Sequence, residues 1–271
     1  MALHPDWIVP DWPAPARVRA ACTTRTGGVS RLPFDSLNLG DHVRDDPVAV
    51  VANRQVLCQA IGVRPVFLQQ VHGLDVAVLD AGTPDGTVAD ACVTAAPGVA
   101  CTIMVADCLP VLLTDRQGRR VAAAHAGWRG LAGEGGYGVL ESVFKSFWHD
   151  PIVDGSCRAI ENKASETLAW LGPCIGPRAF EVGGEVRDAF CANQAEAASC
   201  FTALGGGKYL ADLAGLARQR LRALGVTAIY GNDGSAPWCT VSQPSRFFSH
   251  RRDSGVRGGS GRFAACIWLG D

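Results

Sequence analysis

The hydrophobic pattern is strongest over residues 99–131, where two apolar runs flank the polar tetrapeptide Asp-Arg-Gln-Gly. Aspartate at the first position and glycine at the fourth favour a type I turn, so this pattern predicts a β-hairpin. A turn closed between Asp115 and Gly118 places Cys108 directly opposite His125. Directly opposed side chains of an antiparallel pair lie about 4.5–5.5 Å apart on one face of a sheet. The hairpin is therefore expected to bring a thiol to an imidazole.

Both faces of this hairpin are apolar. Proline at position 110 cannot donate to a strand ladder, and a one-residue bulge there would turn the thiol and the imidazole to opposite faces. With a regular register the pattern predicts a strand pair covered on both sides, as in a layered sandwich. The residues on one face are Leu109, Val111 and Leu113, and those on the other are Leu112 and Val121.

The rest of the chain predicts short strands mixed with helices. A helix over 47–61 is well marked, because Asp45 or Asp46 can cap it and Pro47 suits its first turn. The pattern indicates no repeat or linker, so we expect one domain over residues 1–271, with a polar surface segment at 149–166. The other expected helices span 139–148, 183–200 and 208–224, and the other expected strands span 18–24, 66–73, 75–80, 166–177, 226–231 and 263–269.

Composition narrows the function classes. The 271 residues are 48% hydrophobic and 19% charged, which is typical of a folded domain, and the net charge of −1 gives no basic surface for nucleic acid or an anionic membrane. The longest apolar run, at 99–113, is too short to span a bilayer. The eleven cysteines show no paired spacing, and Pro5, Asp6 and Pro10 interrupt any secretory leader. We therefore expect a cytoplasmic protein that acts on a small molecule.

Two histidines and one cysteine in apolar surroundings form a candidate metal site. His72 is expected to end an apolar strand, where an imidazole is costly to bury without a partner, and Cys108 and His125 also lie in apolar strands. Two imidazoles and a thiolate suit Zn²⁺ and leave a fourth position open for water or substrate. For each residue taken alone, a structural role is the alternative. The other histidines are assigned to the surface (His4 and His149) or to surface or supporting roles in polar loops (His42 and His250).

Other residues offer weaker signals. Arg25 and Arg251 are candidates for binding an anionic substrate group, with solvated surface arginines as the alternative. Asp107 is either catalytic or a buried structural carboxylate, and Glu181 is a possible proton carrier beside the substrate. The glycines at 133–138 match a dinucleotide-binding pattern without the required strand before them, so they predict only a helix N-terminus suited to phosphate.

Several sequence blocks follow one another between about residue 8 and residue 269: ACTTRTGGVS, FDSLNLG, QVHG, ADCLPVLL, AAAHAGWRG, LGPCIGPRAFEVG, KYLADL and FFSHRRD. Together they resemble the YfiH-like laccase-domain family, also known as polyphenol oxidase or purine nucleoside phosphorylase. The resemblance implies an α+β fold of two packed mixed sheets with helices outside, and a metal site at His72, Cys108 and His125. It also implies phosphorolysis of purine nucleosides, including methylthioadenosine, and deamination of adenosine. The chain departs from close relatives by extra residues at 149–166 and 254–260.

Three functions follow from this resemblance and these residues. The first is a zinc enzyme that binds a purine nucleoside and phosphate, in which replacing Arg25 should raise the KM for phosphate. The second is copper-dependent phenol oxidation, although six histidines cannot build the four-copper cluster of a laccase. The third is a metal-free hydrolase with Cys108 as nucleophile and His125 as base, acting on an amide of a peptidoglycan precursor. An adaptor with structural zinc is the least favoured. The sequence leaves the native metal, the physiological substrate and the oligomeric state open.

Overall fold

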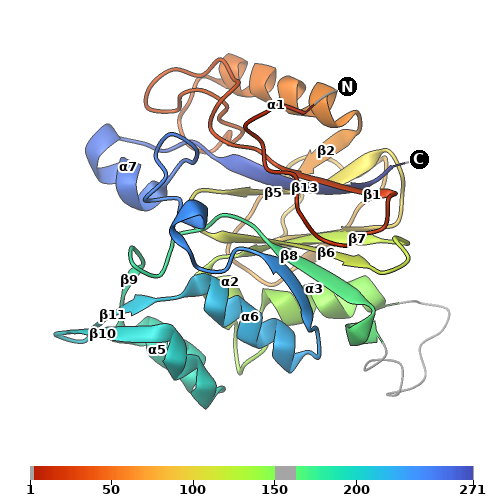
Figure 1. Ribbon diagram of the computed structural model, residues 1–271. Helices are drawn as coiled ribbons and strands as arrows, with labels where there is room; N and C mark the ends of the chain where they lie inside the picture. Colours follow the sequence, from red (N-terminus) through yellow and green to blue (C-terminus); the bar gives the residue numbers. More distant parts are fainter. Residues whose placement is uncertain (1–2, 150–162, 271) are drawn as a thin grey trace.

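Two β-sheets pack face to face at the centre of the molecule (Figure 1). The computed structural model describes residues 3–149 and 163–270. The four-stranded sheet has the order β1 (Val18–Cys22), β13 (Phe263–Leu269), β5 (Val99–Val105), β2 (Arg64–Phe67). The six-stranded sheet has the order β12 (Ala228–Gly231), β8 (Thr167–Leu171), β6 (Leu109–Asp115), β7 (Val121–Ala126), β4 (Ala91–Thr94), β3 (Val76–Val78).

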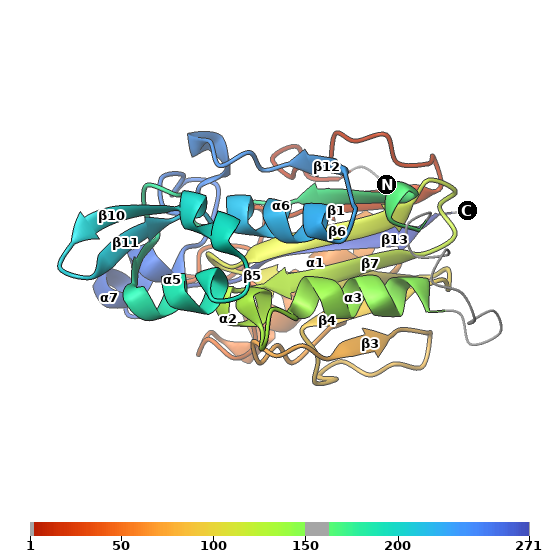
Figure 2. The same cartoon turned by 90° about the horizontal axis from the view of Figure 1, so that it is seen from below.

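Helices cover the outer face of each sheet, which confirms the predicted α+β sandwich. Helix α1 (Pro47–Ile61) lies over the four-stranded sheet, while α2 (Trp128–Ala132), α3 (Val139–Trp148) and α6 (Leu213–Ala223) lie over the six-stranded sheet (Figures 1 and 2). Helices α5 (Gly184–Cys191) and α7 (His250–Arg257) stand at one end, and short 3-10 turns occupy Ala195–Cys200 and Ala236–Trp238. No helix within the described residues is long and apolar enough to cross a membrane.

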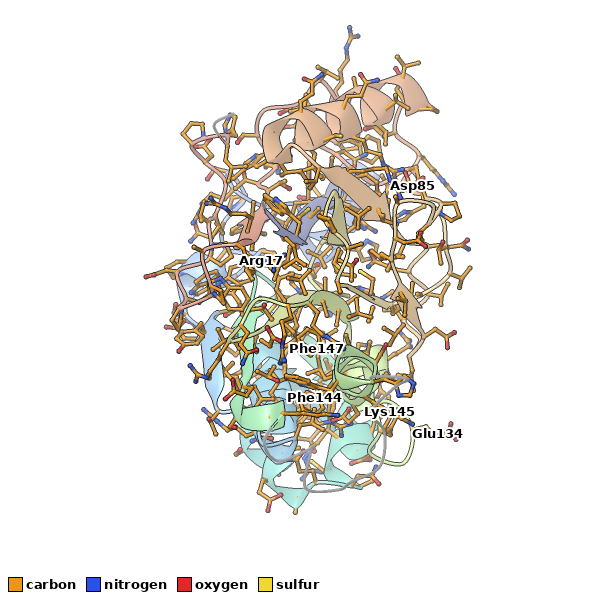
Figure 3. The ribbon with its side chains drawn as sticks, turned by 90° about the vertical axis from the view of Figure 1, so that its right-hand side faces the viewer. Arg17, Asp85, Glu134, Phe144, Lys145 and Phe147 are labelled. Carbon is orange, nitrogen blue, oxygen red and sulfur yellow. The ribbon has the colours of Figure 1, made fainter. Side chains whose placement is uncertain are left out.

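Capping and amphipathic spacing explain the best-predicted helices. Asp46 caps α1 by accepting the N–H of Val48 at 2.9 Å, and Pro47 occupies its first position, as expected. Helix α3 buries Phe144 and Phe147 and exposes Lys145, and Figure 3 shows these side chains on different sides of the helix. The helices therefore form where the sequence provides both a cap and an apolar stripe.

The central strands are covered on both faces, as predicted. Leu109, Val111 and Leu113 of β6 pack with the helices on the outer side of their sheet. Leu112 and Val121 pack in the layer between the two sheets. The candidate metal site lies at one end of this layer, where Cys108 packs against it.

The turn between β6 and β7 forms where predicted, but the strand register differs from the predicted one by two residues. The N–H of Gly118 donates to the carbonyl of Asp115 at 3.0 Å. The buried Asp115 carboxylate also accepts the N–H of Arg119 at 2.8 Å, which keeps Arg119 in the loop. The ladder therefore closes with Thr114 opposite Val121 instead of Thr114 opposite Arg119.

Pro110 rather than Cys108 consequently lies opposite His125, and the predicted pairing of Cys108 with His125 is wrong. A shift of two residues leaves every side chain on its predicted face, because the strand repeat is two. Cys108 directly precedes the first ladder residue, Leu109, at the point where the chain passes from the four-stranded to the six-stranded sheet. Asp107, before it, has a φ of 95°, and this left-handed residue turns the chain.

Two predicted helices are shorter than expected. The span 183–200 contains α5 and a 3-10 turn, and the span 208–224 begins as a strand, with α6 starting after Asp212, which caps it by accepting the N–H of Gly215. A third sheet, β10 (Phe201–Gly205), β11 (Lys208–Ala211) and β9 (Glu181–Gly183), projects from one end (Figure 2). Most of the predicted surface segment at 149–166 lies outside the described residues.

Candidate metal centre and adjoining cavity

His72, Cys108 and His125 converge at the end of the layer between the sheets. One potential ligand atom from each lies within 4.8 Å of the others, and Sγ of Cys108 is 3.7 Å from Nε2 of His72. The two imidazole rings meet edge to face, with centroids 4.7 Å apart. The predicted strand at 66–73 ends at Phe67, so His72 comes from the loop after β2 and not from a strand. The three side chains nevertheless form a possible metal-binding group.

A single buried carboxylate, that of Asp90, holds two of these side chains in place. It accepts the backbone N–H groups of Val71, His72 and Gly73 at 3.0, 2.9 and 2.6 Å. The same carboxylate lies 2.8 Å from Nδ1 of His125, which leaves Nε2 of that ring for a metal or for Cys108. Burial raises the pKa of Asp90, but the hydrogen bonds from His125 and from the backbone outweigh burial and lower it.

Sequence reasoning missed Asp90, which falls in a segment interpreted as a turn-rich loop. The available signal was its place directly before the buried strand β4, because an aspartate at the start of an apolar strand needs hydrogen-bond donors. Its three backbone donors also explain the conformation of His72, whose φ of 61° is left-handed. The loop therefore adopts this shape around the carboxylate.

Cys108 and His125 shift each other's pKa. Burial raises the pKa of the Cys108 thiol, but the charge of His125 and hydrogen bonds from His125 and His72 lower it to about 6. Burial lowers the pKa of His125, but the Cys108 thiolate and the Asp90 carboxylate raise it to about 9. The metal-free site is thus a thiolate beside an imidazolium at neutral pH.

This donor set fits a borderline or soft metal ion. A thiolate and two imidazoles are ligands that Zn²⁺ and copper accept, and hard cations such as Mg²⁺ prefer oxygen. The carboxylate–histidine pair of Asp90 and His125 is the usual outer support of a metal-bound imidazole. Three ligands from the described residues leave room for water or substrate on the ion.

A cavity of about 460 Å³ opens beside these three side chains. Of the predicted substrate residues, Arg251 lines it, and so does Asp107, whereas Arg25 and Glu181 are not among its lining residues. His42 and His250, which the sequence assigned to surface or supporting roles, also lie on its wall. The remaining lining residues are Gln70, Met104, Val105, Ala106, Trp128, Arg129, Ile175, Phe180 and Arg262.

Both carboxylate oxygens of Asp107 are engaged within the fold. Oδ1 accepts the hydroxyl of Thr240 at 2.5 Å, and Oδ2 accepts the backbone N–H of Arg251 at 2.6 Å. Asp107 therefore joins the start of β6 to the first turn of α7. These contacts favour the structural alternative for this carboxylate, and its catalytic role stays a prediction.

Arg25 and Glu181 make contacts outside the cavity wall. The buried Arg25 guanidinium donates to the Asp35 carboxylate at 3.0 Å and to the carbonyls of Asp35 and Pro244. A hydrogen bond from Lys208 lowers the pKa of the exposed Glu181. The structure does not bring either residue to the three potential ligands, and their substrate roles stay predictions.

The glycine-rich helix start predicted to suit phosphate already has an anion. Glu141 of α3 accepts the N–H of Gly138 at 2.8 Å, and Arg220 of α6 donates to the same carboxylate at 3.0 Å. This internal carboxylate disfavours a phosphate at the same helix end, and the phosphate there stays a prediction.

Gly127 packs against two of the potential metal ligands, His72 and Cys108, so a larger residue there tests whether these side chains must hold their positions. Its backbone has an ordinary φ of −66°, but a Cβ there would lie 2.8 Å from Cδ2 of His72 and 3.0 Å from Sγ of Cys108. The Gly127→Ala substitution should displace these side chains and weaken metal binding about 10- to 100-fold, measured by competition with a chelator. The matched control is Gly184→Ala, whose Cβ would meet its nearest atom at 3.7 Å. An unchanged affinity in Gly127→Ala would show that neither side chain must hold its position.

The pKa of Cys108 leads to a second prediction. Iodoacetamide should alkylate Cys108 of the metal-free protein at a rate that rises with pH around a midpoint of about 6, since the thiolate is the reacting form. The modified Cys108 is quantified in its peptide after digestion. His125→Asn removes the charge that lowers this pKa, so the midpoint should move up towards the ordinary thiol value of about 8.5. A wild-type midpoint already near that ordinary value would contradict the thiolate–imidazolium pair.

Comparisons with known proteins agree with this fold. The chain is 55% identical to "Purine nucleoside phosphorylase PA4543" of Pseudomonas aeruginosa, over 98% of this chain and 99% of that protein. It is 49% identical to "Purine nucleoside phosphorylase YfiH" of Escherichia coli K12, over 97% and 98% of the two chains. The crystal structure of the Neisseria meningitidis protein NMB0706 superposes with a TM-score of 0.84 at 46% identity, over 98% of this chain and all of that one.

The match to a family model spans nearly the whole chain. The model, described as multi-copper polyphenol oxidoreductase laccase, matches residues 19–270. YlmD from Geobacillus stearothermophilus is similar in structure at lower identity, with a TM-score of 0.76 at 30% identity over 94% of this chain and 93% of that one. The chain therefore belongs to the YfiH-like family of laccase-domain proteins.

Proposed function

We propose that this protein is a metal-dependent purine nucleoside phosphorylase whose reaction takes place in the cavity beside His72, Cys108 and His125. The observation that carries the proposal is the charge of the cavity wall. Three arginines, Arg129, Arg251 and Arg262, line it together with one carboxylate, Asp107, whose oxygens are both hydrogen-bonded within the protein. A wall of this kind suits a phosphate dianion. The two relatives named above carry the same activity in their names.

The apolar part of the wall suits a flat base. Trp128, Ile175 and Phe180 lie on the same cavity as the arginines, and mixed apolar and polar linings are typical of small-molecule sites. The cavity volume of about 460 Å³ is within the usual range for such ligands. A purine nucleoside can therefore place its base on the apolar wall and its ribose towards the arginines.

The residues of the chain have distinct roles in this proposal. The arginines hold phosphate so that one of its oxygens faces C1′ of the ribose, and holding two reactants together supplies much of the rate enhancement. Asp107 positions Arg251 through its backbone N–H. A Zn²⁺ ion held by His72, Cys108 and His125 would supply positive charge for substrate oxygens. Copper is the alternative ion for the same ligands.

The proposal includes adenosine, inosine and methylthioadenosine as substrates and deamination of adenosine as a second activity. Copper-dependent phenol oxidation is less favoured, because the described residues offer one potential metal-binding group, which could hold a single copper ion and not a four-copper cluster. Oxygen consumption by copper-loaded protein tests this alternative. The hydrolase alternative rests on Cys108 and His125 acting without metal. Product analysis with metal-defined and metal-free protein separates these functions.

The proposed function predicts the products from inosine. Metal-loaded protein should release hypoxanthine and ribose 1-phosphate, and only when phosphate is present. With adenosine, ammonia release would show the additional deamination. Base release that does not depend on phosphate would overturn phosphorolysis in favour of hydrolysis, and equal activity in metal-free protein would contradict the proposed metal dependence.

Arg129 allows a direct test of the phosphate site. Its exposed guanidinium lies over the Trp128 ring, so Arg129→Gln should leave the fold intact while raising the KM for phosphate about tenfold, a loss of about 1.4 kcal/mol. Arg116→Gln, an arginine bonded to the Ser165 carbonyl away from the cavity, is the matched control. Arg25→Ala tests the sequence-based prediction in the same assay. A phosphate KM that rises in Arg25→Ala and not in Arg129→Gln would contradict the placement of phosphate on the arginine wall.

A further inference from the structure

Phosphorolysis of a nucleoside needs a proton as well as phosphate. When the bond between C1′ and N9 breaks, its electron pair goes to the purine, which leaves more readily if a proton reaches N7 at the same time. Arginine keeps its proton at any physiological pH, so the cavity arginines cannot supply it. The proton must come from another group on the cavity wall or from water.

Most of the other proton-bearing groups on the wall are already committed. His72, Cys108 and His125 form the potential metal-binding group. The Asp107 oxygens accept hydrogen bonds from Thr240 and from the Arg251 backbone. Two histidines, His42 and His250, remain among the described lining residues.

His250 has the geometry of an oriented proton donor. It is the first residue of α7, and its Nδ1 lies 2.6 Å from Oγ of Ser254, one helical turn later. With Nδ1–H donating to this hydroxyl oxygen, Nε2 is the ring nitrogen that gains and loses a proton. His250 lines the cavity and Ser254 is not among its lining residues, which favours an arrangement with Nε2 facing the substrate.

His42 lacks this arrangement. Its Nδ1 lies 3.5 Å from the carboxylate of Asp41, which is itself exposed. Burial and the charge of Arg262 lower the pKa of His42 and so disfavour the protonated imidazole that a proton donor requires, although the Asp41 carboxylate raises this pKa. The cavity therefore favours His250 over His42 as the donor.

We propose that His250, oriented by Ser254, is the general acid that protonates the departing purine. This inference rests on the proposed function. A phosphate oxygen forms a bond to C1′ as the C1′–N9 bond breaks, and the electron pair enters the purine ring. The Nε2 proton of the His250 imidazolium passes to N7, which gives the neutral base and a neutral histidine. His250 regains its proton from the acidic oxygen of the ribose 1-phosphate product through water.

The test compares two substrates that differ in their need for a proton. Inosine needs N7 protonation, whereas 7-methylinosine carries a methyl group there and releases a neutral base without it. With metal-loaded His250→Gln, kcat for inosine should fall about 100-fold or more, while kcat for 7-methylinosine should change by less than about threefold. Ser254→Ala keeps the imidazole and loses its orientation, so it should show a smaller loss confined to inosine. Metal content and circular dichroism check that the site and the fold are intact.

His42→Gln is the matched control, since it removes another cavity histidine and should change both substrates by the same factor. Equal losses on the two substrates in His250→Gln, or no loss on inosine, would overturn the assignment of His250 as the acid. If wild-type protein cleaves inosine without phosphate or not at all, the proposed function fails first, and the assignment fails with it. If wild-type protein cleaves inosine only when phosphate is present, a contrary result for His250→Gln contradicts the assignment of His250 alone.

Discussion

The hydrogen bonds of one buried carboxylate, that of Asp90, determine the form of the candidate site. The Asp90 carboxylate accepts hydrogen bonds from three successive backbone N–H groups, those of residues 71–73, and also contacts Nδ1 of His125 at 2.8 Å. Without a carboxylate at this point, the loop would leave three donors unsatisfied and His72 in an unfavourable left-handed conformation. Burying a charge is costly, and here the cost is offset by hydrogen bonds from groups that the site needs to orient.

The sheet sandwich supplies the rest of the geometry. His125 belongs to a central strand, whereas Cys108 stands at the crossing from one sheet to the other, after the left-handed Asp107. Asp107 in turn fixes the first turn of α7 through the N–H of Arg251. Two aspartates, Asp90 and Asp107, thus connect the potential metal ligands, an arginine of the cavity and the proposed acid His250. Rigid placement of this kind suits a reaction that depends on holding two substrates together.

Local patterns predicted α1, α3, the strands β5 to β7 and β13, and the two covered faces of β6, because caps and apolar spacing are local properties. The register of β6 with β7 depended on the carboxylate of Asp115, which holds Arg119 in the loop, and no apolar pattern encodes that contact. The third sheet was missed because β11 and α6 form one continuous apolar stripe in the sequence. His72, Cys108 and His125 were found from residue chemistry and family resemblance. Asp90 bonds to residues 71–73 and to His125, which are distant in the chain, and these contacts appear only in the folded structure. The contact of His250 with Ser254 likewise requires the helix to form.

If Asp90 orients His72 and His125 for metal binding, the zinc affinity of Asp90→Asn shows it most directly. This substitution keeps the size of the side chain but removes its charge and part of its accepting capacity. The control is Asp85→Asn, since Asp85 also accepts a backbone N–H, that of Phe67 at 3.0 Å, but is not among the residues that line the cavity. Zinc binding should be about 10- to 100-fold weaker in Asp90→Asn and unchanged in Asp85→Asn, measured by competition with a chromophoric chelator. Equal zinc affinity in Asp90→Asn and wild-type protein would contradict this role of Asp90.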